Sequence, residues 1–87
     1  MIELTEIHAI DQCTDLEIRQ RMLSSKKAKF TKHFIARKNG DEIGFLAVDI
    51  IPSVDYLVLY ELFVPSRVRG LGLGVSLVGE VEKLELR

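Results

Sequence analysis

Residues whose types and spacing could do chemistry lie close together near the end of the sequence. Gly70, Gly72 and Gly74 alternate with leucines directly after Arg69, and Arg67 stands two residues earlier. Glycine places no side chain between a ligand and the backbone N–H groups, and the two arginines add positive charge. This composition favours the binding of an anion, and a diphosphate is the expected group.

A strand before these glycines and a helix after them must position the turn. Residues 57–64 are apolar, β-branched or aromatic apart from Glu61, which is typical of a strand. Apolar residues then recur at helical spacing, at Leu73, Leu77, Val78, Val81 and Leu84. The first turn of a helix has unpaired N–H groups and the positive end of the helix dipole, so we expect phosphate to bind there.

The glycine spacing excludes two common nucleotide motifs. A P-loop would continue with lysine and serine or threonine, whereas Gly74 is followed by Val75 and Ser76. A dinucleotide fingerprint needs a third glycine three residues after the second, and the candidate positions hold Val75 and Leu77. A glycine-rich turn that only lets the helix pack closely on the strand is the simpler alternative.

The remaining pattern is Arg-x-x-Gly-x-Gly, which begins at Arg69 and ends at Gly74. Here the sequence resembles the GNAT superfamily of N-acetyltransferases, whose acetyl-CoA-binding motif has this form and lies between a central strand and a helix. Residues 61–65, Glu-Leu-Phe-Val-Pro, also resemble the end of the family's strand. The resemblance implies a single α/β domain over residues 1–87, with a mixed, mostly antiparallel sheet and flanking helices, which in this chain is truncated after the motif helix.

The resemblance further implies transfer of an acetyl group from acetyl-CoA to a primary amine, without a metal. The cofactor-binding residues would be Leu62, Phe63, Val64, Arg69, Gly70, Leu71, Gly72, Leu73, Gly74 and Ser76. Glu61 is the candidate general base, because a carboxylate near the central strand usually removes the proton of the amine. Alternatively, Glu61 points to solvent or bonds a backbone group. The alternative function is a non-catalytic module that binds CoA or another protein.

The chain stops at Arg87, where the family continues with another strand and helix. The central strand would then be an apolar sheet edge with unpaired backbone groups, which predicts a homodimer through that edge. Family members often use a tyrosine after the motif as the general acid. Tyr56 and Tyr60 both precede the motif, so neither can be assigned that role by position.

Composition limits the other classes of function. A net charge of −1 over 87 residues argues against a nucleic-acid partner bound by charge alone. No apolar run reaches the length of a membrane span and no export signal is recognisable, so a cytoplasmic location is expected. Cys13, the single cysteine, is predicted to be a small buried residue, with a catalytic thiol as the minor alternative. His8 and His33 lie too far apart in sequence to suggest a metal pair.

The pattern of the first half of the chain predicts a strand over 2–8, a helix over 11–23 and a hairpin of strands 33–38 and 42–51. Thr14 and Glu17 could form a capping box, and Leu16, Ile18, Met22 and Leu23 an apolar stripe. The Asn39-Gly40 pair favours a tight hairpin turn, and Gly44 suggests close packing or a bulge. The lysines at 26, 27, 29 and 32 suggest a solvated loop or, alternatively, attraction of an anionic acceptor or of CoA phosphates.

Overall fold

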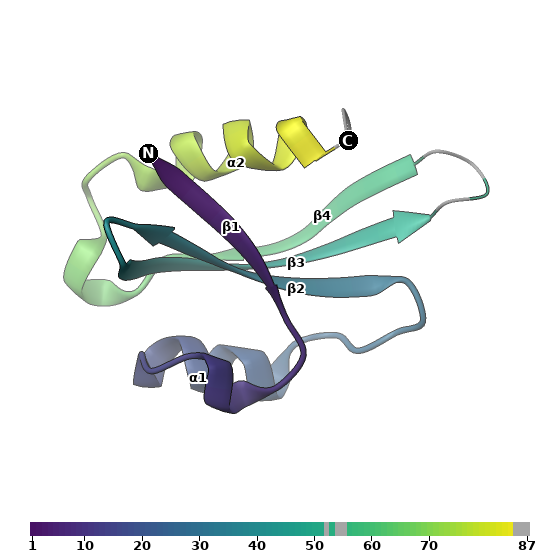
Figure 1. Cartoon of the computed structure of the whole chain (residues 1–87), viewed down its shortest axis with the longest axis horizontal. Helices are drawn as coiled ribbons and strands as arrows, with labels where there is room; N and C mark the ends of the chain where they lie inside the picture. Colours follow the sequence, from purple (N-terminus) through teal and green to yellow (C-terminus); the bar gives the residue numbers. More distant parts are fainter. Residues whose placement is uncertain (52, 54–55, 85–87) are drawn as a thin grey trace.

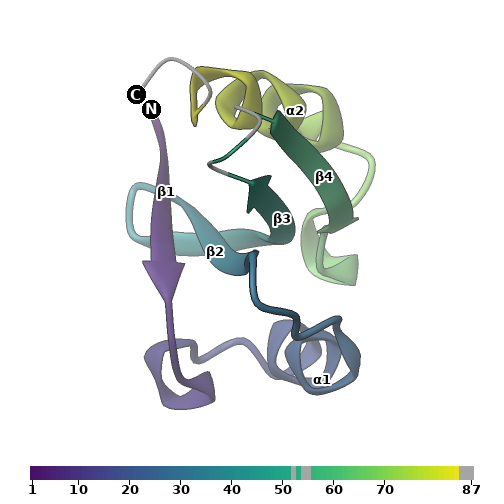
Figure 2. The ribbon, with the colours of Figure 1, turned by 90° about the vertical axis from the view of Figure 1, so that its right-hand side faces the viewer.

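The computed structural model describes residues 1–51, 53 and 56–84. Four antiparallel strands form one sheet in the order β1-β2-β3-β4. The strands are β1 Ile2–Ile7, β2 Thr31–Lys38, β3 Asp41–Ile51 and β4 Tyr56–Phe63. Helix α1 (Leu16–Ser24) covers one face and helix α2 (Leu73–Leu84) covers the other (Figures 1 and 2). The predicted α/β architecture with an antiparallel sheet and flanking helices is therefore confirmed.

The hairpin between β2 and β3 forms at the predicted turn. Asn39 and Gly40 both have positive φ, 52° and 82°, which suits the right-handed twist of the two strands. β2 begins two residues earlier than expected, at Thr31, whose Oγ1 donates a hydrogen bond of 2.6 Å to Asp49 Oδ1 on β3. This side-chain hydrogen bond lies at the end of the β2-β3 pairing, where no apolar pattern in the sequence predicts a strand.

Gly44 combines both features expected of it. The pairing register shifts here, from Ala36 opposite Gly44 to Arg37 opposite Glu42, which leaves one extra residue on β3. A Cβ on Gly44 would lie 2.6 Å from Leu77 Cδ1. The missing side chain thus allows α2 to pack closely on the sheet.

The core has one apolar cluster on each face of the sheet. On the α1 face, Ile18 and Met22 pack with Cys13 and with residues of the sheet, including Phe45. On the α2 face, Leu77 and Val81 pack with Phe34, Ala36, Ile43, Leu46 and Val48. Because β2 and β3 both contribute to both clusters, these two central strands join the two halves of the core.

The predicted start of the first helix is wrong. Asp15, not Thr14, is the N-cap of α1, and its Oδ1 accepts a hydrogen bond of 3.0 Å from the Ile18 N–H. Residues 10–12 form a separate 3-10 turn, η1 (Ile10–Gln12). The predicted stripe is also only half buried, because Leu16 and Leu23 are 74% and 66% exposed.

β4 contains a bulge that changes which side chains face which helix. Ala47 lies opposite Glu61 but Val48 lies opposite Leu59, so Tyr60 has no partner in the register. Leu57 and Leu59 pack in the cluster under α2, whereas Phe63 packs in the cluster under α1. All three have odd numbers and would share a face in a regular strand. The bulge therefore turns the end of β4 towards α1.

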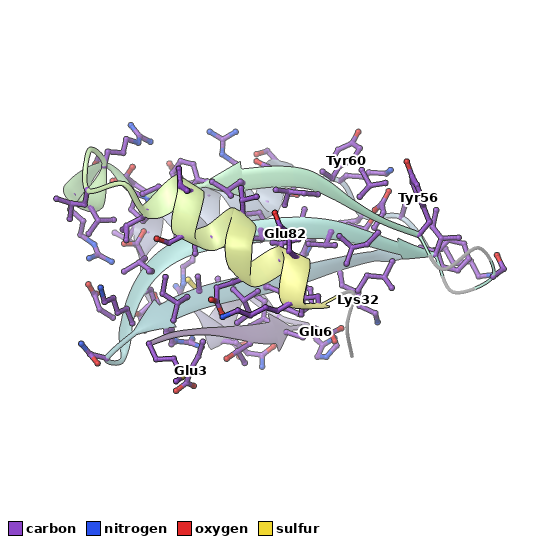
Figure 3. The ribbon with its side chains drawn as sticks, turned by 90° about the horizontal axis from the view of Figure 1, so that it is seen from above. Glu3, Glu6, Lys32, Tyr56, Tyr60 and Glu82 are labelled. Atoms are coloured by element: carbon purple, nitrogen blue, oxygen red, sulfur yellow. The ribbon has the colours of Figure 1, made fainter. Side chains whose placement is uncertain are left out.

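The two edges of the sheet differ in character (Figure 3). The β1 side carries Glu3 and Glu6, and Glu6 lies 3.5 Å from Lys32. The β4 side carries Tyr56 and Tyr60, which are 58% and 55% exposed. Charge on an edge discourages pairing with another strand, so β4 is the edge more open to a partner.

Candidate functional site

The glycine turn is open on its outer side. Gly70 and Gly72 have φ angles of 84° and 74°, which residues with side chains rarely adopt. A Cβ added at Gly70, Gly72 or Gly74 would meet no atom within 4 Å. Leu71 between them is 69% exposed. The backbone of the turn is thus accessible to a ligand rather than covered by packing.

The helix that follows has an uncapped, uncharged beginning. α2 starts at Leu73, directly after Gly72, which has no side chain that could act as an N-cap. The first turn, which the structure describes in full, contains no acidic residue. Ser76 is exposed there. The unpaired N–H groups and the positive end of the dipole therefore meet no protein carboxylate within that turn.

Arg69 ties the glycine turn to the end of β4. Its Nε donates a hydrogen bond of 2.9 Å to the carbonyl oxygen of Val64, and its guanidinium lies 5.5 Å from the ring centre of Phe63. A more distant ion pair, at 3.9 Å, joins it to Glu17 of α1. The arginine of the motif thus has a positioning role in addition to its charge.

Arg67 does not add free charge to the turn, in contrast to the interpretation from sequence. Its Nε lies 3.2 Å from Asp15 Oδ2 and its Nη1 lies 3.0 Å from Asp41 Oδ2. A further hydrogen bond goes to the carbonyl oxygen of Glu42. Arg67 lies in the short helix η3 (Ser66–Val68), so these contacts fix the start of the motif loop to α1 and to the β2-β3 hairpin.

Glu42 is the buried carboxylate that organises this junction. Burial would raise its pKa, but hydrogen bonds from the N–H groups of Asp15 and Thr14 and from the Thr14 hydroxyl outweigh burial and lower the pKa to about 2. Arg37 adds an ion pair at 3.2 Å. Sequence reasoning missed this residue, since a glutamate beside a hairpin turn looks solvated.

Cys13 is buried, as predicted, and its environment opposes reactivity. Burial, together with the hydrogen bond from its thiol to the Glu42 carboxylate, raises the pKa of Cys13 to about 11. The thiolate, not the thiol, is the nucleophile, so this group is unreactive at neutral pH.

Glu61 lies on the α1 face of β4, just after the bulge. Its Oε1 accepts a hydrogen bond of 2.8 Å from Ser25 Oγ, and its Oε2 lies 3.4 Å from Arg21 Nη1. The side chain is 21% exposed. Side chains of α1 and the residue after it therefore hold this carboxylate, with one edge still open to solvent.

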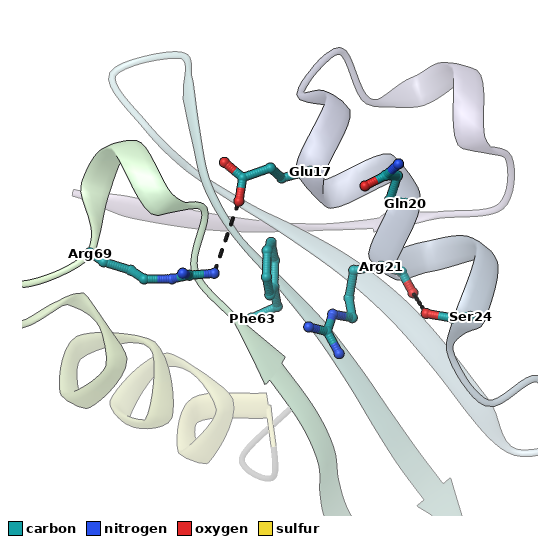
Figure 4. A pocket seen from close by; sticks show the side chains of 6 residues that line it. All are labelled: Glu17, Gln20, Arg21, Ser24, Phe63 and Arg69. Atoms are coloured by element: carbon teal, nitrogen blue, oxygen red, sulfur yellow. Dashed lines mark hydrogen bonds and ion pairs between the residues drawn. The ribbon is translucent and has the colours of Figure 1, made fainter.

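A surface pocket of about 440 Å³ lies between α1 and the end of β4 (Figure 4). It is lined by Glu17, Gln20, Arg21, Ser24, Phe63 and Arg69. The guanidinium groups of Arg21 and Arg69 lie on either side of the Phe63 ring (Figure 4). Neither Glu61 nor a glycine of the turn is among these lining residues, so the pocket reaches the motif at Arg69 and β4 at Phe63.

A family model described as Acetyltransferase (GNAT) family matches residues 3–85. The chain belongs to this family. No curated protein and no solved structure gives a significant match. Membership in the GNAT family supports a function of the acetyltransferase type in general.

The GNAT motif residues predicted from sequence come together in one region. The hydrogen bond from Arg69 to Val64 joins the glycine turn to the strand end, and Phe63 lies beneath the Arg69 guanidinium. Leu62 and Val64 face the other way and pack, partly buried, against the cluster under α2. Glu61 shares its face with Phe63, because pairing is regular after the bulge.

The lysines between α1 and β2 are not equivalent in this GNAT domain. Lys26 Nζ lies 2.9 Å from Asp49 Oδ2 and 4.2 Å from the centre of the Tyr60 ring, and the hydrogen bond to Asp49 raises the Lys26 pKa. Lys27 is exposed and lines a small pocket with His8 and His33. Within the described residues, no group of three His, Cys, Asp or Glu side chains could hold a metal ion, and no helix is long and apolar enough to cross a bilayer.

Proposed function

We propose that the protein is an acetyl-CoA-dependent N-acetyltransferase that acts on a primary amine. The observation that carries the proposal is the open turn at Gly70, Gly72 and Gly74 on the uncapped N-terminus of α2. A diphosphate is the group that suits such a site, because it accepts several N–H bonds and its charge matches the helix dipole. Membership in the GNAT family supports CoA as its carrier.

In this proposal, backbone N–H groups from Arg69 to Gly74 hold the diphosphate, and the exposed Ser76 hydroxyl adds one donor. The thioester supplies an activated acetyl group. The backbone of Leu62 to Val64 then lies along the acyl end, where an N–H group can stabilise the developing oxyanion. Strand edges offer such groups because they have no neighbouring strand, and β4 is the last strand in the sheet order.

Glu61 is the proposed general base. The attacking amine must be neutral, and a carboxylate beside Arg21, which lines the pocket, can take its proton directly or through a water molecule. Ser25 and Arg21 hold two different oxygens of Glu61, at 2.8 and 3.4 Å, and so fix its orientation. A Glu61→Gln variant should keep this packing, bind acetyl-CoA as before and lose kcat.

The proposal is tested by calorimetric titration with acetyl-CoA of two glutamate variants of the same helix. Gly74→Glu places a carboxylate in the first turn without the strain of a positive φ, whereas Gly79→Glu places one further along α2, also in open space. We expect Gly74→Glu to weaken binding at least about tenfold and Gly79→Glu to leave it unchanged. Equal binding by both variants, or no binding to the unaltered chain, would refute the proposed diphosphate site at the glycine turn.

A non-catalytic CoA-binding or protein-interaction module is the alternative, and the position of β4 at the sheet edge favours it. No other strand among the described residues pairs with the outer side of β4 to form a second wall of an acyl channel. Binding of CoA without turnover of a broad panel of amines would select this alternative over the enzyme.

We also propose that the protein forms the homodimer expected from the sequence. A second copy could pair with β4 through its free backbone groups, and Tyr56 and Tyr60 on that edge would be covered. Light scattering at high micromolar concentration tests it, and a monomer there contradicts it. The cytoplasmic location stays a prediction.

A further inference from the structure

We propose that Arg67 is a positioning residue for the diphosphate site at the glycine turn. It holds the start of the motif loop, residues 65–72, against α1 and the β2-β3 hairpin. It thereby keeps the turn in the shape that binds phosphate, without touching the ligand itself. The proposal rests on the proposed function, because it names a residue that sets the affinity of that site.

The glycine turn does not hold its own shape. Gly70 and Gly72 have φ angles of 84° and 74°, and glycine is the residue with the greatest backbone freedom. A Cβ at Gly70, Gly72 or Gly74 would meet no atom within 4 Å, and Leu71 is 69% exposed. The conformation of the turn must therefore be set by the segments on either side of it.

The two flanking segments are fixed in different ways. After the turn, helix α2 is held by packing, because its Leu77 and Val81 are buried in the core. Before the turn, η3 itself contains no buried residue, so polar contacts must hold it. The N–H of Ser66 donates a hydrogen bond of 3.2 Å to the Glu17 carboxylate on α1. Arg67 adds contacts with two elements.

Arg67 uses all three nitrogens of its guanidinium group in these contacts. Its Nε lies 3.2 Å from Asp15 Oδ2 at the start of α1, and its Nη1 lies 3.0 Å from Asp41 Oδ2 at the start of β3. Its Nη2 donates a hydrogen bond to the carbonyl oxygen of Glu42. Because the guanidinium is planar and its donor directions are fixed, three such contacts determine both its place and its orientation. Arg67 thus fixes η3, which ends two residues before Gly70.

The order of the turn before binding affects the affinity for a ligand. A turn that is loose in the free protein must be ordered when the diphosphate binds, and this cost weakens binding. Fixing the backbone of one residue corresponds to about a tenfold change in Kd. Removal of the Arg67 contacts should therefore weaken the binding of acetyl-CoA, although no contact with the ligand is lost.

The first test is calorimetric titration of Arg67→Met and Arg37→Met with acetyl-CoA. Arg37 is the matched control, because its Nη2 donates to Glu42 Oε2 on β3 and to the carbonyl oxygen of Gln12 on η1, not to the motif loop. Both variants remove one positive charge and loosen the same junction. We expect Arg67→Met to raise the Kd about tenfold and Arg37→Met to leave it within about twofold.

A third variant separates geometry from charge. In Asp15→Asn the amide oxygen can keep the N-cap, while the NH2 group replaces the oxygen that faces Arg67 Nε. Loss of a negative charge near the motif loop should by itself tighten the binding of a phosphate ligand. Positioning requires the opposite, so we expect the Kd to rise about threefold. This variant also carries the test if Arg67→Met does not fold.

A measurement without ligand tests the order of the turn directly. Backbone NMR relaxation of Gly70, Leu71 and Gly72 should give order parameters of about 0.85 in the unaltered protein and in Arg37→Met. In Arg67→Met these values should fall towards about 0.6.

Equal binding of acetyl-CoA by Arg67→Met and Arg37→Met would overturn the proposal, because Arg67 would then serve stability alone. Tighter binding by Asp15→Asn would also overturn it, because charge would then decide the affinity. If the unaltered chain does not bind acetyl-CoA, the proposed function fails. The order parameters then decide separately whether Arg67 fixes the turn, and unchanged values in Arg67→Met would show that it does not.

Discussion

Replacement of Glu42 by glutamine should remove a large part of the protein's stability at neutral pH. The folded-state pKa of Glu42 is about 2, against an ordinary value of 4.5, and its side chain is only 9% exposed. At about 1.36 kcal/mol per pKa unit, this difference corresponds to about 3 kcal/mol. Glutamine keeps an oxygen acceptor but turns a donor towards the N–H groups of Thr14 and Asp15, so we expect a loss of about 2–3 kcal/mol at pH 7.

The pH dependence of stability gives the sharper measurement. Because folding lowers the pKa of Glu42, its contribution is complete above pH of about 5 and is lost as the pH falls towards 2. Urea denaturation of the unaltered protein at a series of pH values should show this decline. In the Glu42→Gln variant the decline should be smaller by about 3 kcal/mol over the same interval.

Glu3→Gln is the matched control, because Glu3 is exposed on β1. It should leave both the stability at pH 7 and the decline below pH 5 within about 0.5 kcal/mol of the unaltered protein. The reasoning is refuted if Glu42→Gln and the unaltered protein lose stability in parallel between pH 5 and pH 2.5. Such parallel curves would mean that the bonds around Glu42 do not favour its charged form.

Three further predictions concern packing, capping and the thiol. Gly44→Ala should destabilise the fold by about 1–3 kcal/mol in thermal denaturation, since its Cβ would approach Leu77 Cδ1 to 2.6 Å and the backbone oxygen of Phe63 to 3.3 Å; an unchanged Tm would show that the helix can move aside. Asp15→Ala should lower the free energy of unfolding by about 1 kcal/mol through loss of the N-cap, and by more through loss of the ion pair with Arg67. Asp15→Asn should keep the cap and lose only the ion pair. Cys13 should resist a thiol reagent at pH 7–9 in the folded protein and react once urea is added, and fast modification of the folded chain would contradict both its burial and its raised pKa.

Local patterns were enough to predict much of the fold. Alternating apolar residues indicated β1, the Asn39-Gly40 pair indicated the hairpin, and the spacing after Gly74 indicated α2. Each of these signals is decided by neighbours within a few residues. The start of α1 was predicted wrongly because Thr14 could cap a helix, and Glu42, far away in sequence, binds it instead. Asp15 then becomes the cap.

The candidate site was only partly predictable for the same reason. The glycine turn is a local motif and could be located from sequence alone. The partners of Arg67 lie 52 and 26 residues away in the sequence, so its ion pairs with Asp15 and Asp41 could not be anticipated. The contacts of Glu61 with Ser25 and Arg21 depend on the bulge at Tyr60, which no pattern in the sequence indicated.

The bulge at Tyr60 divides β4 into two halves that can evolve separately. The half with Leu57 and Leu59 lies in the core under α2, where changes in volume cost stability. In the other half, Glu61 and Phe63 lie on the α1 face, and Phe63 lines the pocket beside α1, where a substitution alters what the pocket accepts. Substitutions in β4 can thus change what the pocket accepts while the packing under α2 stays the same. Deletion of the unpaired Tyr60 would leave Leu59 opposite Val48 and Glu61 opposite Ala47, so both halves would keep their faces in a regular strand.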